Sequence, residues 1–214
     1  MEIYLTEQEQ IDQLKKLWHQ YGKPIIAGIV LALALSYGWH YWQKQQEIYR
    51  ERAGLLYLQM VNNIEHDNSK KIEAQAEQLM NQFPKTPYAV LASLQLAKQA
   101  VAAGQWDQAQ AKLHWAAENA RDPALKELAV LRAARVYIAT HKPQQALDIL
   151  KGQTQTNFPS YAYEITGDAF LAMNKPEQAR QAYAKALQAT SDVKNTRPLL
   201  QMKYDAIPMG EKSA

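Results

Sequence analysis

The chain has 214 residues, of which 47% are hydrophobic and 21% are charged. This length and composition allow one domain, or one compact domain with an appendage, and they exclude a disordered, collagen-like or polytopic membrane protein. The absence of cysteine excludes disulfides, thiolate metal sites, iron–sulfur clusters and cysteine nucleophiles. A net charge of +3 without a stripe of Lys and Arg argues against a nucleic-acid partner.

Residues 1–23 predict a short amphipathic helix. Thr6 and Glu9 have the spacing of a capping box. Apolar residues then recur at helical spacing, and they are Ile11, Leu14, Leu17, Trp18 and Tyr21. We expect this helix to end at Gly22 and a second to begin at Pro24. Two interpretations stay open: a helix on a membrane surface or partner, and a simple lead-in to the next segment.

Residues 24–43 carry no Asp, Glu, Lys or Arg and predict a transmembrane helix. The run Ile25–Trp42 would be about 27 Å long at 1.5 Å per residue, close to the roughly 30 Å of a hydrocarbon core. Basic and aromatic residues at its two ends are typical of the membrane interface. These candidates for contact with a lipid bilayer are Lys23, Tyr37, Trp39, Tyr41, Trp42 and Lys44.

Two other interpretations of this run are weaker. A cleaved signal peptide would use Ile25–Leu35 as its apolar region and Ala32–Ala34 as its cleavage site, but Ala34 lies inside the apolar run. A core helix of a soluble protein rarely extends over 20 positions without a charge. The two flanks carry equal numbers of basic residues, so charge does not decide the orientation of the span.

Residues 44–214 predict an all-α fold, an α-solenoid of tetratricopeptide-like helix hairpins. Alanines recur with tetratricopeptide-like steps of 33, 37 and 33 residues from Ala76 to Ala109, Ala146 and Ala179. Small residues let the two helices of a hairpin cross closely. The predicted packing positions are Ala97, Ala109, Ala134, Ala146, Gly167 and Ala179. We also expect residues 71–83 to pair with 45–66, and 197–207 to form a closing helix. The alternative is a plain helical bundle with accidental spacing.

The first helix of each hairpin would line a concave face through its fifth and ninth positions. These predicted groove residues are Leu94, Lys98, Leu131, Arg135, Glu164 and Asp168. The groove would be apolar with a basic middle and an acidic end, and it could hold an extended or helical segment of a partner. The alternative is that these side chains cover neighbouring helices or face water.

The sequence predicts no enzyme. It has no phosphate-binding loop, nucleophile elbow or zinc-protease motif, and its five histidines lack the spacing of a helical metal pair. Glu164 and Asp168 could share one helical face, as paired carboxylates or cation ligands do. Like charges at this spacing are usually solvated, so we expect no cofactor and no metal.

The order of parts resembles the bacterial YfgM-like family of ancillary SecYEG translocon subunits. The resemblance rests on the start Met1–Tyr4, the end of the span at Gly38–Trp42, the repeat segments Leu91–Ala97 and Leu131–Val136, and the close at Gln201–Lys203. It covers essentially the whole chain, although no single motif is diagnostic. Residues 205–214 extend past the family's usual end, and we assign them no role.

The resemblance implies an inner-membrane protein with 1–23 in the cytoplasm, 24–43 in the bilayer and the repeats of 44–214 in the periplasm. It implies the SecYEG translocon and a membrane-anchored periplasmic chaperone as partners, and a part in handing secretory proteins onward. Such clients are possible further partners. A rival interpretation is a cytoplasm-facing scaffold or stress-response regulator that binds a signalling protein through the same repeats. A membrane-bound hydrolase is a third, for which the sequence offers no catalytic constellation.

Overall fold

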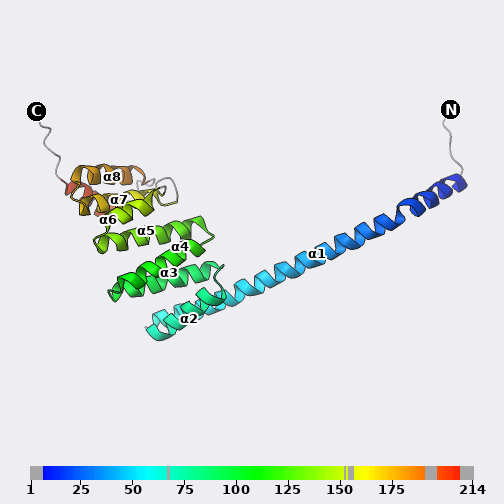
Figure 1. Cartoon of the computed structure of the whole chain (residues 1–214), viewed down its shortest axis with the longest axis horizontal. Helices are drawn as coiled ribbons and strands as arrows, with labels where there is room; N and C mark the ends of the chain where they lie inside the picture. The colour runs from blue at the N-terminus through cyan, green and yellow to red at the C-terminus, as the bar shows by residue number, and fades with distance from the viewer. Residues whose placement is uncertain (1–6, 67, 152, 154–156, 191–196, 208–214) are drawn as a thin grey trace, which may run out of the picture. The chain divides into compact units, whose positions relative to one another are not determined.

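The computed structural model describes residues 7–66, 68–151, 153, 157–190 and 197–207, and these residues form helices without strands. The chain divides into two compact units, residues 1–51 and 52–214. Figure 1 labels most of the helices. In chain order they are α1 (Glu7–Glu65), α2 (Ser69–Gln82), α3 (Pro87–Ala102), α4 (Trp106–Asn119), α5 (Pro123–Ala139), α6 (Pro143–Leu150), α7 (Pro159–Ala172), α8 (Pro176–Gln188) and α9 (Pro198–Asp205).

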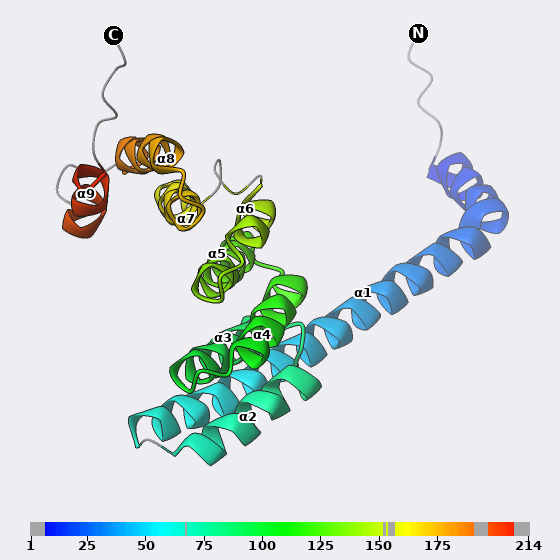
Figure 2. The ribbon, with the colours of Figure 1, turned by 60° about the vertical axis from the view of Figure 1, so that its left-hand side comes forward.

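Helix α1 is continuous through the expected break, so the prediction of two helices separated at Gly22 was wrong. Pro24 lies inside the helix, where it removes one backbone hydrogen bond at a cost of about 3 kcal/mol. A long helix has enough flanking hydrogen bonds to tolerate this loss, and Figure 2 shows that α1 bends in its first part. The ring of Trp18 lies 3.3 Å from where a Cβ of Gly22 would stand. Thr6 of the expected capping box lies outside the described residues.

The second unit is a series of helix hairpins. We call α3, α5 and α7 the A helices and α4, α6 and α8 the B helices. Each A helix contacts the B helix that follows it, and α5 also contacts the A helices before and after it. This pattern is that of a solenoid, in which each repeat touches its neighbours. The view in Figure 2 separates the successive hairpins along the stack.

Side-chain caps begin two of the A helices. Thr86 Oγ1 accepts a hydrogen bond from the Ala89 amide at 3.4 Å. Asp122 Oδ1 accepts from the amides of Ala124 and Leu125 at 2.8 and 3.1 Å. A proline follows each cap, at a position where the missing N–H has no partner to lose.

The turn from each A helix to its B helix repeats the same backbone geometry. Gly104, His141 and Asn174 have φ values of 71°, 58° and 57°, each seven residues after a predicted small position. The residue after each one donates a backbone hydrogen bond five residues back, as Gln105 does to Ala100 O at 2.8 Å. This is the Schellman geometry, which requires a left-handed residue. The repeats therefore share their turn as well as their packing positions.

The first hairpin of the second unit is formed by the end of α1 and by α2, as expected. Ala53 and Met60 of α1 are buried in one cluster with Ile72, Ala76 and Leu79 of α2. Asn63 Nδ2 donates to Gln75 Oε1 at 2.9 Å across this pair. The last helix, α9, packs Leu200 against α8 at the other end of the unit, so it is the expected closing helix.

Candidate functional site

The predicted membrane-interface residues lie on α1 and are exposed to solvent. All six are exposed, and they are Lys23, Tyr37, Trp39, Tyr41, Trp42 and Lys44. The rings of Trp39 and Trp42 contact each other in a tilted arrangement, with 5.5 Å between their centroids. The part of α1 from Trp18 to Glu65 is long and apolar enough to cross a membrane, and none of its apolar window is buried. This exposure contradicts the alternative of a core helix. The chain therefore carries a candidate membrane anchor.

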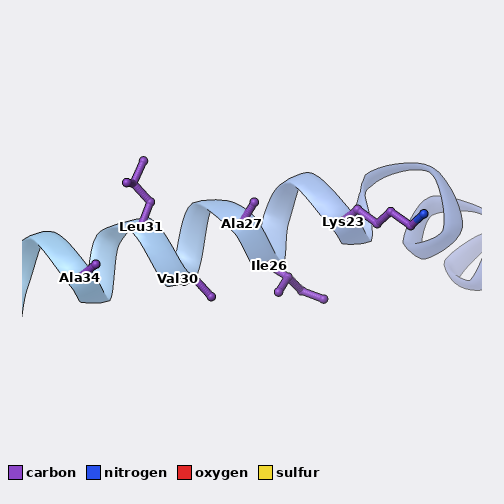
Figure 3. A pocket seen from close by; sticks show the side chains of 6 residues that line it. All are labelled: Lys23, Ile26, Ala27, Val30, Leu31 and Ala34. Carbon is purple, nitrogen blue, oxygen red and sulfur yellow. The ribbon is translucent and has the colours of Figure 1, made fainter.

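An apolar surface on α1 begins at Lys23 and continues into the span. Figure 3 shows its side chains, which all belong to this one helix and point to different sides of it. They are Lys23, Ile26, Ala27, Val30, Leu31 and Ala34. A surface of this kind suits the bilayer, because acyl chains can surround a single apolar helix without an enclosed cavity.

The six predicted repeat-packing positions are all buried. Ala97 is 2% exposed, Ala109, Ala134, Ala146 and Ala179 are fully buried, and Gly167 is buried on α7. The surroundings of Gly167 leave no room for a side chain, because an added Cβ would stand 2.3 Å from Tyr183 Cε1. The phenol ring of α8 thus lies directly on the backbone of α7. Only glycine allows helices to approach this closely.

The predicted groove residues fall into two classes. At the fifth positions, Leu94 and Leu131 are 3% and 4% exposed and belong to core clusters. The prediction that these leucines line an open groove is therefore wrong, because they fill the space between consecutive hairpins. At the ninth positions, Lys98 and Arg135 are exposed. They lie at the same register on α3 and α5, which contact each other.

Glu164 and Asp168, the predicted acidic end of the groove, are occupied by α9. Lys203 Nζ donates to Glu164 Oε1 at 2.9 Å and to both Asp168 carboxylate oxygens at 2.8 Å. Arg197 forms a further ion pair with Glu164, and Tyr183 OH donates to Asp168 Oδ1 at 2.6 Å. Neither carboxylate presents a free acidic patch, so the prediction of an acidic end is corrected. The carboxylate pair instead holds the closing helix.

The start of α9 is fixed by the start of α7. Arg197 Nη1 donates to Ser160 Oγ at 2.7 Å, and its guanidinium lies 4.1 Å from the centroid of the Tyr161 ring. Because Arg197 contacts the first turn of α7 and Lys203 contacts Asp168 further along, α9 runs parallel to α7. It therefore takes the place that the A helix of a further repeat would have.

The charges around Glu164 shift its titration and that of Lys203. Burial alone would raise the pKa of Glu164, but hydrogen bonds and attraction from Lys203 and Arg197 hold it below its usual range. Burial alone would lower the pKa of Lys203, but Asp168 and Glu164 raise it. Both ion-pair partners therefore stay charged at neutral pH. In this cluster both Glu164 and Asp168 are thus paired with basic residues at the start of α9 and within it.

The sequence interpretation missed Arg197, Lys203 and Tyr183 as partners of this carboxylate pair. Lys203 lies 39 residues from Glu164 in the chain and Arg197 lies 33 residues away. The sequence did contain a hint of these ion pairs: the predicted closing helix carries two basic residues, and the last A helix before it carries two carboxylates four residues apart. In the part of the chain that the structure describes, no group of three or more acidic or histidine side chains could hold a metal ion.

Comparison with known proteins gives a consistent result. The family model described as a tetratricopeptide repeat-like domain matches residues 15–209. Relatives named ancillary SecYEG translocon subunit occur in Escherichia coli K12, 30% identical with 96% of this chain and 98% of the relative covered, and in Haemophilus influenzae, 30% identical with 90% and 94% covered. A third, from Aggregatibacter actinomycetemcomitans, is 33% identical with 87% and 91% covered. No solved structure gives a significant match.

Proposed function

Because the chain belongs to the tetratricopeptide repeat-like family of ancillary SecYEG translocon subunits, we propose that it is a membrane-anchored adaptor of the Sec translocon. Its repeats bind partner proteins and help to pass secretory proteins to a periplasmic chaperone that is itself anchored in the membrane. The adaptor has no catalytic activity of its own. The observation that carries this proposal is the near-complete coverage of relatives that bear the translocon name.

The anchor supports this function through local concentration. A span at residues 24–43 would keep residues 44–214 at the membrane surface, beside the exit of the channel, so that weak contacts with the translocon become effective. In the proposed topology residues 1–23 are cytoplasmic, the span crosses the inner membrane and the repeats are periplasmic. The exposed apolar side chains on α1 and the aromatic residues at the end of the span support the membrane crossing. The orientation rests on the relatives named as translocon subunits.

The repeat domain supports partner binding without chemistry. The A helices share one surface, which we call the A-helix face: the exposed or half-buried side chains on the side of α3, α5 and α7 that carries Lys98 and Arg135. Side chains of this kind can bind a peptide segment through shape and charge. We propose that the binding groove includes Lys98 and Arg135, while the buried Leu94 and Leu131 pack beneath it.

Co-purification tests association with the translocon. The tagged full-length protein is extracted from membranes in mild detergent, and SecY, SecE and SecG are measured in the eluate. In a matched control, an unrelated single membrane span replaces residues 1–43 and is fused to the repeat domain. We expect recovery of all three subunits with the native chain. Failure to recover any of them after cross-linking in intact cells would contradict the proposal.

A topology reporter separates this function from its rival. The equal numbers of basic residues on the two flanks also fit a cytoplasm-facing scaffold that binds a signalling protein. An alkaline phosphatase fused after Ala214 is active only in the periplasm, and a green fluorescent protein fused there is bright only in the cytoplasm. We expect phosphatase activity. A mass measurement on the membrane-bound chain tests the alternative of a cleaved signal peptide: we expect the intact mass, with residues 1–43 retained.

A further inference from the structure

The carboxylates of the A helices are all engaged inside the protein. Helices α3, α5 and α7 contain three acidic residues. Glu127 accepts hydrogen bonds from the amides of Asn157 and Phe158 at 2.9 and 3.0 Å. Glu164 and Asp168 bind Lys203 of α9. The internal contacts of the solenoid therefore neutralise or cover every negative charge that these helices supply.

The basic residues of the same helices differ from these carboxylates within the part of the chain that the structure describes. They are Lys98, Lys126, Arg132 and Arg135, and all four are exposed. Among the residues that the structure describes, none of them forms an ion pair. Arg132 and Arg135 lie three residues apart on α5 and so share one side of this helix. Burial and the like charge of Arg135 lower the pKa of Arg132. Two like charges held this way attract an anionic group.

Apolar side chains accompany these cations on the A-helix face. Val101, one turn after Lys98, is 37% exposed. Leu91 and Leu128 are half-buried at equivalent positions of α3 and α5, and Ile138 is half-buried one turn after Arg135. The surface thus combines fixed positive charges with apolar side chains on neighbouring helices. This combination favours a ligand that carries carboxylates and apolar groups at helical or extended spacing.

We propose that the A-helix face over α3 and α5 binds an acidic, partly apolar peptide segment of a partner protein, with Lys98 and Arg135 contacting its carboxylates. This inference rests on the proposed adaptor function and specifies the kind of segment that the repeats recognise. Charge complementarity favours an acidic segment, because Lys98 and Arg135 are exposed on this face whereas Glu164 and Asp168 form ion pairs with Lys203 of α9. A basic segment would meet repulsion at the same surface.

Binding is tested with the full-length protein in detergent micelles and a fluorescein-labelled peptide, the unit Glu-Leu-Ala-Glu-Ala repeated three times. A second peptide has Lys in place of each Glu. We expect the acidic peptide to bind, the basic peptide to bind at least tenfold more weakly, and added salt to weaken the acidic complex. The double variant Lys98→Glu/Arg135→Glu should lose about tenfold or more in affinity for the acidic peptide, since it turns two attractions into repulsions.

A matched control keeps the net charge of this variant and moves the changes elsewhere. Lys70 at the start of α2 and Lys175 before α8 are both exposed and lie outside the A helices. The variant Lys70→Glu/Lys175→Glu should change the affinity by less than about twofold. Equal binding of the two peptides, or an equal loss in both double variants, would overturn the proposal.

Two further measurements distinguish peptide binding from lipid binding by the same face, and distinguish failure of the peptide site from failure of the adaptor function. Vesicles of phosphatidylglycerol are compared with vesicles of phosphatidylcholine: if Lys98→Glu/Arg135→Glu loses vesicle binding and the acidic peptide does not bind, the face recognises lipid and the proposal is overturned. Co-purification with SecY is measured on the same variants. Retained SecY with no peptide binding by the native chain refutes the peptide site alone, whereas loss of SecY from the native chain refutes the adaptor function.

Discussion

Replacing Gly167 by alanine tests the close contact between α7 and α8. The new Cβ would stand 2.3, 2.5 and 2.9 Å from three ring atoms of Tyr183, distances at which the ring must move. Tyr183 is fully buried, and its hydroxyl is held by Asp168 at 2.6 Å. The ring therefore cannot move without breaking this hydrogen bond and disturbing the ion pairs of Lys203.

The expected loss of stability is about 2–4 kcal/mol. Overpacking of a buried site costs about 1–3 kcal/mol, and loss of a hydrogen bond to a charged group costs about 1.5–3 kcal/mol. The better helix propensity of alanine returns about 1 kcal/mol. With a urea slope of about 2 kcal/mol per molar, the midpoint of unfolding should fall by about 1–2 M.

The assay follows helical circular dichroism of the full-length protein in a mild detergent as urea is added. Gly54→Ala is the matched control, because a Cβ there would meet Tyr88 at 3.3 Å, a contact that a small shift relieves. We expect this control to change stability by less than about 1 kcal/mol. An unchanged or higher midpoint for Gly167→Ala would refute the view that Tyr183 fixes the distance between α7 and α8.

Three further predictions concern the ion pairs, the turns and the caps. The depressed pKa of Glu164 contributes stability that is present above its unfolded pKa of about 4.3 and is lost as the pH falls below that value. The raised pKa of Lys203 contributes stability that is lost only as the pH rises above about 10.4. Melting temperatures measured from pH 3 to 11 should therefore fall at both ends of this range. His141→Gly and Asn174→Gly should each stabilise the protein by about 0.5–1 kcal/mol, because glycine adopts positive φ without strain, and a lower melting temperature would contradict this. Asp122→Ala should destabilise it by about 1 kcal/mol through loss of the N-cap, measured by urea unfolding, with Asp122→Asn retaining most of the stability.

The repeat architecture could be predicted because its determinants are local and periodic. Small residues such as Ala134 and Gly167 recur where helices cross, and Asp122 precedes a proline at a helix start. Each of these patterns has a direct steric or hydrogen-bonding cause. The apolar span could be predicted for a similar reason, since its length and lack of charge are set by the thickness of a bilayer.

The remaining features depend on competition between contacts that local patterns do not reveal. Pro24 stays inside α1 because the helical segments on both sides outweigh one lost hydrogen bond. Leu94 and Leu131 are buried because consecutive A helices pack more closely than a groove lined by their fifth positions would allow. The role of Lys203 depends on residues almost 40 positions earlier in the chain, and α9 carries none of the small-residue spacing that identifies the repeats.

The closing helix links the end of the solenoid to the character of its A-helix face. A stack of hairpins must cover the last repeat, and α9 does so by packing Leu200 and Ile207 on α8 and by placing Lys203 between Glu164 and Asp168. Truncation of an ion pair at such a partly buried site is unfavourable, because the remaining charges lose their partner. The cap therefore uses the carboxylates of α7 for stability. The cations of α3 and α5 form no ion pair with the residues that the structure describes, and this difference leaves the A-helix face positive where a partner can reach it.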